Sequence, residues 1–201
     1  MTLQRLVLIA ALGLLACEAG FALPRALVLR IDQADLAWGD SRLVAKLTTA
    51  LTRDPEIRVV VADHQVDSFR PFPPELHNLD SLLDWGTGVG GRYLLLIQVD
   101  REGLECRKTF SVPVLFHRWE TLAVITGEMR LIDLQKRRLV LAEPFHEKLT
   151  ASRQFQSSSE DNSHDPALHV SAGEKTELFD ALESRLVDQL SRKVARHTRG
   201  R

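Results

Sequence analysis

The stretch Arg92-Tyr-Leu-Leu-Leu-Ile-Gln-Val-Asp100 decides the fold of this chain. Its run Tyr93–Ile97 carries no charged side chain, which is typical of a strand covered on both faces in an α/β sheet. Immediately before it lies the glycine-rich run Gly86-Thr-Gly-Val-Gly-Gly91, which follows a short helical pattern. A helix, a glycine turn and a buried strand therefore predict an α/β core built around this segment.

The glycine run invites a nucleotide-binding interpretation, but the order of elements around it opposes that function. A phosphate-binding loop follows a strand and opens a helix, so that backbone N–H groups at the helix N-terminus meet the phosphate. Here the helix comes first and the strand second, and no Gly-Lys-Ser/Thr follows. We predict instead that Gly86 ends the helix in a left-handed conformation and that the run is a turn.

The residues before this segment predict a strand–helix–strand unit. Arg25–Ile31 and Ile57–Ala62 are rich in apolar and β-branched residues, which favour strands. Between them, Asp40-Ser41 offers an N-cap for a helix that ends near Thr52. We expect the two strands to be parallel and joined by a right-handed crossover. A second helix is expected over Glu75–Trp85.

The residues after Gly103 predict an antiparallel meander followed by a long helix. Three further strands are expected: Leu104–Phe110, Thr121–Leu134 and Leu139–Phe145, the last with a continuation toward Phe155. The polar stretch at about 156–173 is expected to be a mobile loop. Glu174–His197 carries leucines at every fourth residue, which predicts an amphipathic helix packed on one face of the sheet.

Length and composition fit one globular domain with a real core. The chain has 201 residues, of which 44% are hydrophobic and 26% charged. We predict a single α/β domain over residues 23–198, with a mixed sheet, a βαβαβ start, an antiparallel meander and a long C-terminal helix. The formal net charge of −1 gives no overall field that would attract nucleic acid or an anionic membrane, and no nucleic-acid partner is expected. Basic residues gather only at the C-terminus, where they complement the helix macrodipole: Arg192, Lys193, Arg196, Arg199 and Arg201.

The N-terminus predicts export from the cytoplasm. Arg5 places a positive charge ahead of the apolar run Leu6–Ala16, which is too short to span a bilayer comfortably. Two processing sites compete. Gly20-Phe21-Ala22 suits cleavage after residue 22 of a signal peptide, whereas Leu14-Leu15-Ala16-Cys17 resembles a bacterial lipobox and makes Cys17 a lipidation candidate. The protein is then either free in the periplasm or anchored to the outer membrane by lipid.

Motifs for catalysis or metal binding are not evident in the sequence. Cys106 precedes Arg107-Lys108, which would lower the pKa of its thiol if both lay beside it, but on a strand they alternate between faces. The seven histidines show no zinc-like spacing, and no Gly-x-Ser-x-Gly elbow is present. We therefore predict no catalytic residue, no metal and no cofactor. Two alternatives stay open: a periplasmic hydrolase or thiol-dependent enzyme using Cys106, and a domain that binds a small ligand.

The segment Phe110–Trp119 is more apolar than an exposed turn usually is. Pro113 within it marks an edge, a bulge or a protruding hairpin tip rather than a central strand. An apolar segment that protrudes indicates a surface that contacts a partner. The partner-binding candidates are Phe110, Val112, Pro113, Leu115, Phe116 and Trp119.

Leu83-Asp-Trp-Gly86 followed by Gly91-Arg-Tyr-Leu-Leu-Leu-Ile97 resembles a passage of small periplasmic α/β domains. These belong to envelope proteins: the Tol–Pal translocation protein (its amino-terminal domain), the curli secretion lipoprotein and lipoprotein activators of penicillin-binding proteins. Gly127-Glu-Met-Arg-Leu-Ile-Asp133, ahead of the polar turn Gln135–Arg138, is similar as well. The resemblance covers about residues 25–198. It implies a non-catalytic protein that binds a protein partner during envelope assembly or transport, and it carries over no specific functional residue.

Overall fold

The computed structural model describes residues 25–33, 42–62, 78–112, 116–156 and 170–199. At residues 33, 106, 108–112, 116–119 and 152–156 the description covers the backbone alone. The expected signal peptide, the lipobox with Cys17 and most of the loop expected at 156–173 lie outside these ranges.

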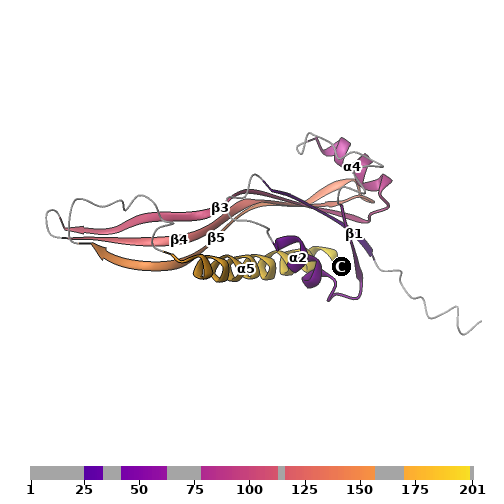
Figure 1. The fold of residues 1–201 in the computed structure, drawn as a ribbon. Helices are drawn as coiled ribbons and strands as arrows, with labels where there is room; N and C mark the ends of the chain where they lie inside the picture. Colours follow the sequence, from indigo (N-terminus) through magenta and orange to yellow (C-terminus); the bar gives the residue numbers. More distant parts are fainter. Residues whose placement is uncertain (1–24, 34–41, 63–77, 113–115, 157–169, 200–201) are drawn as a thin grey trace, which may run out of the picture.

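Within the described ranges, five strands form one mixed sheet and three helices pack against it (Figure 1). In chain order the elements are β1 (Arg25–Gln33), α2 (Leu43–Leu51), β2 (Ile57–Val61), α4 (Leu79–Gly88), β3 (Tyr93–Val112), β4 (Phe116–Asp133), β5 (Arg138–Gln156) and α5 (Ala172–Thr198). The strands lie in the order β2-β1-β3-β4-β5 across the sheet. β3, which begins within the stretch Arg92–Asp100, is therefore the central strand, as predicted.

The N-terminal half of the sheet is parallel. β1 pairs with β2 from Arg25↔Ile57 to Leu29↔Val61, and with β3 from Leu27↔Tyr93 to Gln33↔Val99. Parallel neighbours need crossover connections, and α2 and α4 lie in the two connections. The predicted βαβαβ start is thus confirmed. Arg42 occupies the N-cap position of α2, and the expected cap Asp40-Ser41 lies outside the described residues.

The C-terminal half is an antiparallel meander of long strands. β3 pairs with β4 from Tyr93↔Asp133 to Val112↔Phe116, and β4 pairs with β5 from Asp133↔Arg138 to His117↔Gln156. The prediction of a separate strand at Leu104–Phe110 is wrong, because β3 runs on through Gly103. A bulge at Asp100 absorbs the change of pattern that suggested a break.

Hydrophobic clusters lie on both faces of the sheet. The larger one joins the sheet to α2 and α5, and it contains residues such as Leu95, Ile97 and Leu186, all at most 1% exposed. The smaller one joins the sheet to α4 through Leu94 and Trp85, among others. Figure 1 shows α2 and α5 on one side of the sheet and α4 on the other. Because β3 is covered on both faces here, its first residues form an unbroken apolar run.

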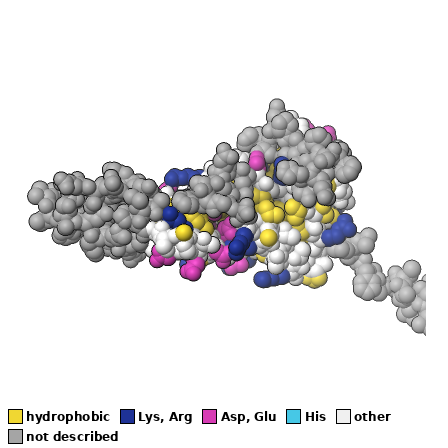
Figure 2. All heavy atoms as spheres, in the orientation of Figure 1, with side chains coloured by type: hydrophobic (Ala, Val, Ile, Leu, Met, Phe, Trp, Pro, Cys, Tyr) yellow, Lys and Arg dark blue, Asp and Glu magenta, His cyan; other side chains and the backbone are white. Residues whose placement is uncertain are grey.

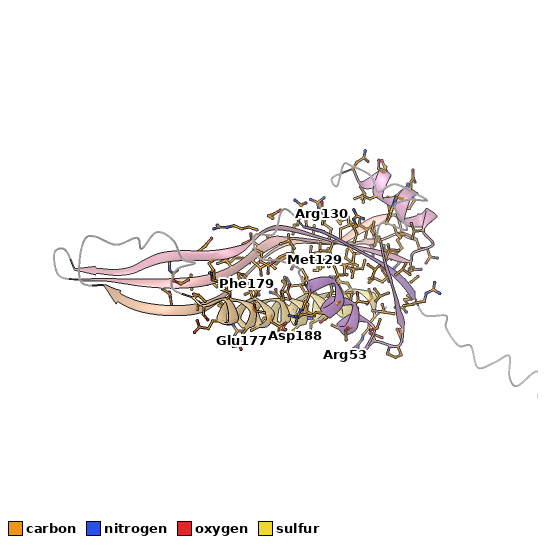
Figure 3. The ribbon with its side chains drawn as sticks, in the orientation of Figure 1. Arg53, Met129, Arg130, Glu177, Phe179 and Asp188 are labelled. Carbon is orange, nitrogen blue, oxygen red and sulfur yellow. The ribbon has the colours of Figure 1, made fainter. Side chains whose placement is uncertain are left out.

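Helix α5 confirms the predicted long amphipathic helix. It starts with a capping box, in which the Ser171 side chain accepts from the N–H of Glu174 and the Glu174 carboxylate accepts from the N–H of Ser171. Figure 3 shows Phe179 on the side of α5 that meets the sheet and Asp188 on the outer side. At its basic end, Lys193 pairs with Glu143 of β5 and Arg199 with Asp54. These C-terminal charges fasten the helix to the domain.

The predicted role of Gly86 is wrong. Gly86 lies inside α4, which continues to Gly88, and the left-handed residue is Gly90 with φ of 79°. A Cβ atom on Gly86 would lie 2.7 Å from Cδ2 of Leu134, so this glycine lets α4 pack closely against the end of β4. The described helix α4 begins at Leu79, after an Asn78 N-cap. The expected start at Glu75 lies outside the described residues.

Candidate functional site

The distal parts of three strands form an arm that consists of residues 101–112 of β3, 116–126 of β4 and 147–156 of β5. β1 ends at the pair Gln33↔Val99, and the arm begins just beyond that pair. Figure 1 shows these strands continuing past the N-terminal end of α5. At about 3.3 Å per residue β3 spans about 65 Å, whereas α5 at about 1.5 Å per residue spans about 40 Å. The arm therefore projects by roughly 25 Å beyond the helix that covers the rest of the sheet. We call that remainder, with its three helices, the body.

Each outer strand of the arm, β3 and β5, has one edge without a strand neighbour among the residues that the structure describes. Among the described strands, β3 pairs only with β4 beyond Val99, and β5 pairs only with β4 along its whole length. A strand edge exposes backbone N–H and C=O groups that can pair with a strand from another chain. The arm thus offers backbone hydrogen bonds on two sides.

The strand register sorts the predicted partner-binding residues onto two faces. Val112 pairs with Phe116, and Phe110 pairs with Arg118, which is two residues from Phe116. Positions 110, 112 and 116 therefore share one face of the ribbon. Trp119 lies on the other face, since it alternates with Ala123 and Ile125, which pack on the α5 side. Pro113 and Leu115 lie outside the described residues, between the ends of β3 and β4.

A glycine in β4 permits the bend at the start of the arm. Gly127 pairs with Val99, next to the bulge at Asp100. A Cβ atom on Gly127 would lie 2.0 Å from the backbone oxygen of Gln98 and 2.5 Å from Cζ of Phe145. Neither the backbone nor a packed aromatic ring can easily give way, so a glycine is required where the ladder changes register.

A buried carboxylate connects the three strands of the arm near the middle of its length. Glu120 on β4 is 7% exposed. It accepts hydrogen bonds from the guanidinium of Arg107 on β3 at 3.0 Å and from the hydroxyl of Thr150 on β5 at 3.2 Å. Burying a carboxylate is costly unless it is paired, so the contacts hold Arg107 and Thr150 in place. This cluster lies on the face of the arm opposite to α5.

A second polar cluster lies where α2 and α5 meet β3, on the other face of the sheet. The Lys46 ammonium lies 2.7 Å from Oδ1 of Asp180 and 2.9 Å from Oε2 of Glu183, a side chain that is almost fully buried. Burial lowers the pKa of Lys46, but its hydrogen bonds to Asp180 and Glu183 outweigh this and raise the pKa overall. The hydrogen bond from Lys46 also lowers the pKa of Asp180.

Glu102 at the start of the arm belongs to the same cluster. Burial raises the pKa of Glu102 to about 7, the charge of Glu183 adds to this, and Lys46 opposes it. A carboxyl group that titrates near neutrality can exchange a proton at physiological pH. Its surroundings are one lysine and other carboxylates that join two helices to a strand. We therefore interpret the cluster as a polar contact that holds α2 and α5 to the root of the arm, rather than as a catalytic centre.

The opposite end of the sheet carries an arginine-lined concavity of about 660 Å³. Arg25 of β1, Arg58 of β2 and Arg92, which precedes β3, line it together with Gly90 and Gly91. The three arginines are far apart in the sequence and meet because three parallel strands start at the same edge. No motif in the sequence marks them for that reason.

A smaller hollow lies on the α4 side of the sheet. Arg30 and Asp32 of β1, Gln98 of β3, and Glu128 and Arg130 of β4 line it, and the last two form an ion pair at 2.7 Å. Figure 3 shows Arg130 on this face and its neighbour Met129 on the α5 side. The cavity volume of about 20 Å³ holds about one water molecule. Pockets for small ligands are typically about 300 Å³ or larger, so this hollow does not suit one.

The remaining expectations concern metals, membrane spans and Cys106. In the ranges that the structure describes, no group of three or more His, Cys, Asp or Glu side chains is arranged to hold a metal ion. No helix in those ranges is long and apolar enough to cross a membrane. The side chain of Cys106 lies outside the description, and the described His146 is exposed on β5. The described residues therefore provide no geometric support for a thiol-dependent enzyme that uses Cys106.

Comparison with known proteins found solved structures that match most of the chain at low sequence identity. No family model matches the chain, and no curated protein matches it. A lipoprotein, GNA1162, from Neisseria meningitidis is 12% identical with a TM-score of 0.41, and the match covers 84% of this chain and 99% of that one. A minor lipoprotein from Acinetobacter baumannii is 10% identical with a TM-score of 0.39, and the match covers 85% of this chain and 91% of that one. The C-terminal domain of LpoB from Salmonella enterica is 11% identical with a TM-score of 0.36, and the match covers 67% of this chain and 90% of that one.

Two of these three structures are lipoproteins by name. None of the three carries a Tol–Pal or curli name. At these identities and TM-scores, the similarity describes the arrangement of helices and strands alone.

Proposed function

We propose that this chain is an exported, non-catalytic envelope protein whose arm binds a protein partner during envelope assembly or transport. The arm itself is the observation that carries the proposal. It extends about 25 Å beyond α5, and among the described strands it has free edges on both sides. The root of the arm packs on α5 through Leu104, Ala123 and Ile125. The length that runs on beyond α5 is best explained by contact with another protein.

The tip of the arm supports a protein partner in particular. Positions 110, 112 and 116 share one face and are occupied by Phe, Val and Phe. Aromatic residues such as Phe are enriched in protein interfaces, whose buried centre is poor in charged residues. Backbone pairing at a strand edge would supply the surrounding hydrogen bonds. Glu120 and its partners keep the three strands aligned, which reduces the ordering cost that binding has to overcome.

The N-terminal sequence supports an envelope location. The apolar run Leu6–Ala16 fits a signal sequence, and Leu14-Leu15-Ala16-Cys17 fits a lipobox. We propose that Cys17 carries a lipid anchor and that the domain lies in the periplasm, held at the outer membrane. The intact mass of the mature protein tests this step, because a lipidated start at Cys17 and a free start at Leu23 differ in mass. A mass that corresponds to a chain starting at Leu23 would show that Cys17 does not anchor the mature protein.

Capture of the partner from the envelope tests the role of the arm. The tagged protein is purified from cross-linked envelopes beside Phe116→Asp and Val112→Asp, and the co-purified protein is identified and its affinity measured. Each variant should weaken binding by about 30-fold or more, since it places a charge in the apolar centre of the interface.

Leu139→Asp is the matched control, because Leu139 is an exposed leucine of β5 in the body, 44% accessible. It should bind the partner as the parent protein does. Equal urea midpoints of all four proteins would show that the losses are not caused by unfolding. Unchanged capture by both arm variants would contradict the proposal.

A further inference from the structure

We infer that the end of the body opposite to the arm docks on the anionic headgroups of a phospholipid membrane and thereby points the arm away from it. We call this surface the basic end. It consists of the arginines of the concavity and the turn between β4 and β5: Arg25, Arg58, Arg92, Lys136, Arg137 and Arg138. The inference rests on the lipid anchor proposed at Cys17, and it concerns the membrane rather than the protein partner.

The arginines of the concavity are only partly neutralised by the protein. Arg25 donates to the carbonyl of Thr198 and lies 3.9 Å from Glu56, and Arg92 lies 3.6 Å from Asp133. Arg58 is exposed and makes no hydrogen bond or ion pair with any residue that the structure describes. A guanidinium group in this state can bind a phosphate oxygen through two N–H groups.

The turn between β4 and β5 adds positive charge beside the concavity. Gln135, the residue before Lys136, lines the concavity itself. The turn residues 136–138 are all exposed. Arg137 lies 3.5 Å from Asp84 and 4.0 Å from Asp80, at the limit of ion pairing, which leaves Lys136 and Arg138 to face solvent. Positive charge therefore extends from β2 across the sheet to the start of β5.

The chain geometry brings this end close to the proposed anchor. Cys17 and Arg25 are so near in the sequence that even a fully extended chain between them spans only about 28 Å. The start of β1 lies at the basic end, whereas the arm points the other way (Figure 1). A lipid on Cys17 would thus keep the basic end near the headgroups, where unscreened attraction acts over roughly 10 Å.

The charge pattern of α5 favours docking by the end rather than by the side. Figure 2 shows Asp and Glu side chains along the N-terminal half of α5, and Lys or Arg side chains where β1 begins. Glu177 and Asp188 on the outer face of α5 would be repelled by an anionic surface. The formal net charge of the chain is −1, so its orientation depends on where the charges lie rather than on their sum.

Vesicle binding by the chain that starts at Leu23, which has no lipid and needs no partner, tests the inference. Its partition onto vesicles of phosphatidylglycerol with phosphatidylcholine is compared with that onto phosphatidylcholine alone, at low and high salt. Partition should require the anionic lipid and fall with salt. The double variant Arg58→Glu/Lys136→Glu should reduce partition by at least about 25-fold, since each lost basic residue costs about fivefold and each new carboxylate is repelled by the anionic lipid.

Arg185→Glu, with a similar charge change on the exposed side of α5, is the control and should change partition less than about twofold. The inference would be overturned if the protein bound neutral vesicles as well as anionic ones, or if it did not bind anionic vesicles at low salt. It would also be overturned if Arg185→Glu lost as much partition as the double variant. Displacement by inorganic phosphate beyond that by chloride of equal ionic strength would overturn it too, because the site would then bind a free anion. None of these outcomes bears on partner capture by the arm.

Discussion

The body and the arm share strands β3, β4 and β5 but differ in what covers them. In the body, residues 94–97 of β3 are at most 6% exposed, because α4 covers one face of the sheet and α2 with α5 cover the other. Past the bulge at Asp100, the same strand carries Arg101 and Arg107 exposed to solvent. One strand thus serves as a core element first and as a projecting ribbon afterwards.

This difference indicates a division of labour. The body holds most of the buried apolar residues, and the arm adds a few at its root, such as Leu104 and Ile125. We therefore expect the outer part of the arm to accept changes of its surface without unfolding the body. The arm is aligned by the polar contacts of Glu120 and starts at a bend that Gly127 makes possible. If this division is right, substitutions should separate into those that unfold the body and those that alter only the arm.

The largest expected effect is the loss of a core leucine from the body. Leu186 of α5 is fully buried against the sheet, so Leu186→Ala should lower the free energy of unfolding by about 3 kcal/mol. Leu139→Ala, the same change at an exposed site of β5, should cost less than about 0.5 kcal/mol. Urea unfolding followed by circular dichroism measures both. Similar losses at the two sites would show that the core of the body is not where we place it.

Gly127→Ala should be the next most harmful change. The new Cβ would meet the backbone of Gln98, so the ladder has to shift, at an expected cost of about 2 kcal/mol. Gly103→Ala is the matched control in β3, where a Cβ would meet nothing within 4 Å, and its cost should stay below about 0.5 kcal/mol. Urea midpoints give both values. A harmless Gly127→Ala would refute the tight junction between body and arm.

Glu120→Ala should loosen the arm and leave the body intact. The change removes the acceptor of Arg107 and Thr150, and it should speed amide hydrogen exchange in the outer half of β4 and β5 by about tenfold. Exchange in residues 94–97 of β3 should stay the same. Faster exchange at both places would mean that arm and body unfold as one unit, and the comparison between them would fail.

The smallest expected effect is a pH dependence due to Glu102. Burial raises the pKa of Glu102 to about 7 in the folded protein, from an ordinary value of 4.5, so the folded state holds the proton more tightly than the unfolded chain does. The stabilisation is full below about pH 4.5 and is lost as the pH rises through about 7, by on the order of 1 kcal/mol after allowance for solvent screening. The free energy of unfolding of the parent protein should therefore fall more steeply with pH across this range than that of Glu102→Gln. Glu105→Gln, on the opposite face of β3, is the control. If the free energy of unfolding of Glu102→Gln depended on pH as steeply as that of the parent, Glu102 would not be the group responsible.

The architecture of the body could be predicted because local pattern and tertiary environment agree there. The apolar run Tyr93–Ile97 indicated a central strand, and the leucine spacing of Glu174–His197 indicated the helix that packs on the sheet. The role of Gly86 was predicted wrongly, because a glycine can serve either as a cap or as a close contact. Only the position of Leu134, far along the chain, decides between the two.

The arm was predicted only in part. Apolar residues around Pro113 indicated a protruding hairpin, and the pairing of Val112 with Phe116 confirms one. Its length was missed, since a bulge at Asp100 and a glycine at position 103 imitate the end of a strand. The cluster of Lys46, Glu102 and Glu183 and the arginines of the basic end were also missed. Such groups join residues from separate elements, and no spacing in the sequence marks them.

Site-specific photo-crosslinking in living cells tests the central claim most directly. A photoreactive amino acid is placed at Val112 in the arm or at Leu139 in the body, and cross-linked envelope proteins are identified by mass spectrometry. The account predicts one dominant protein partner cross-linked from position 112, lost when Phe116→Asp is added, and no such product from position 139. A partner captured from position 139 and not from position 112 would contradict it.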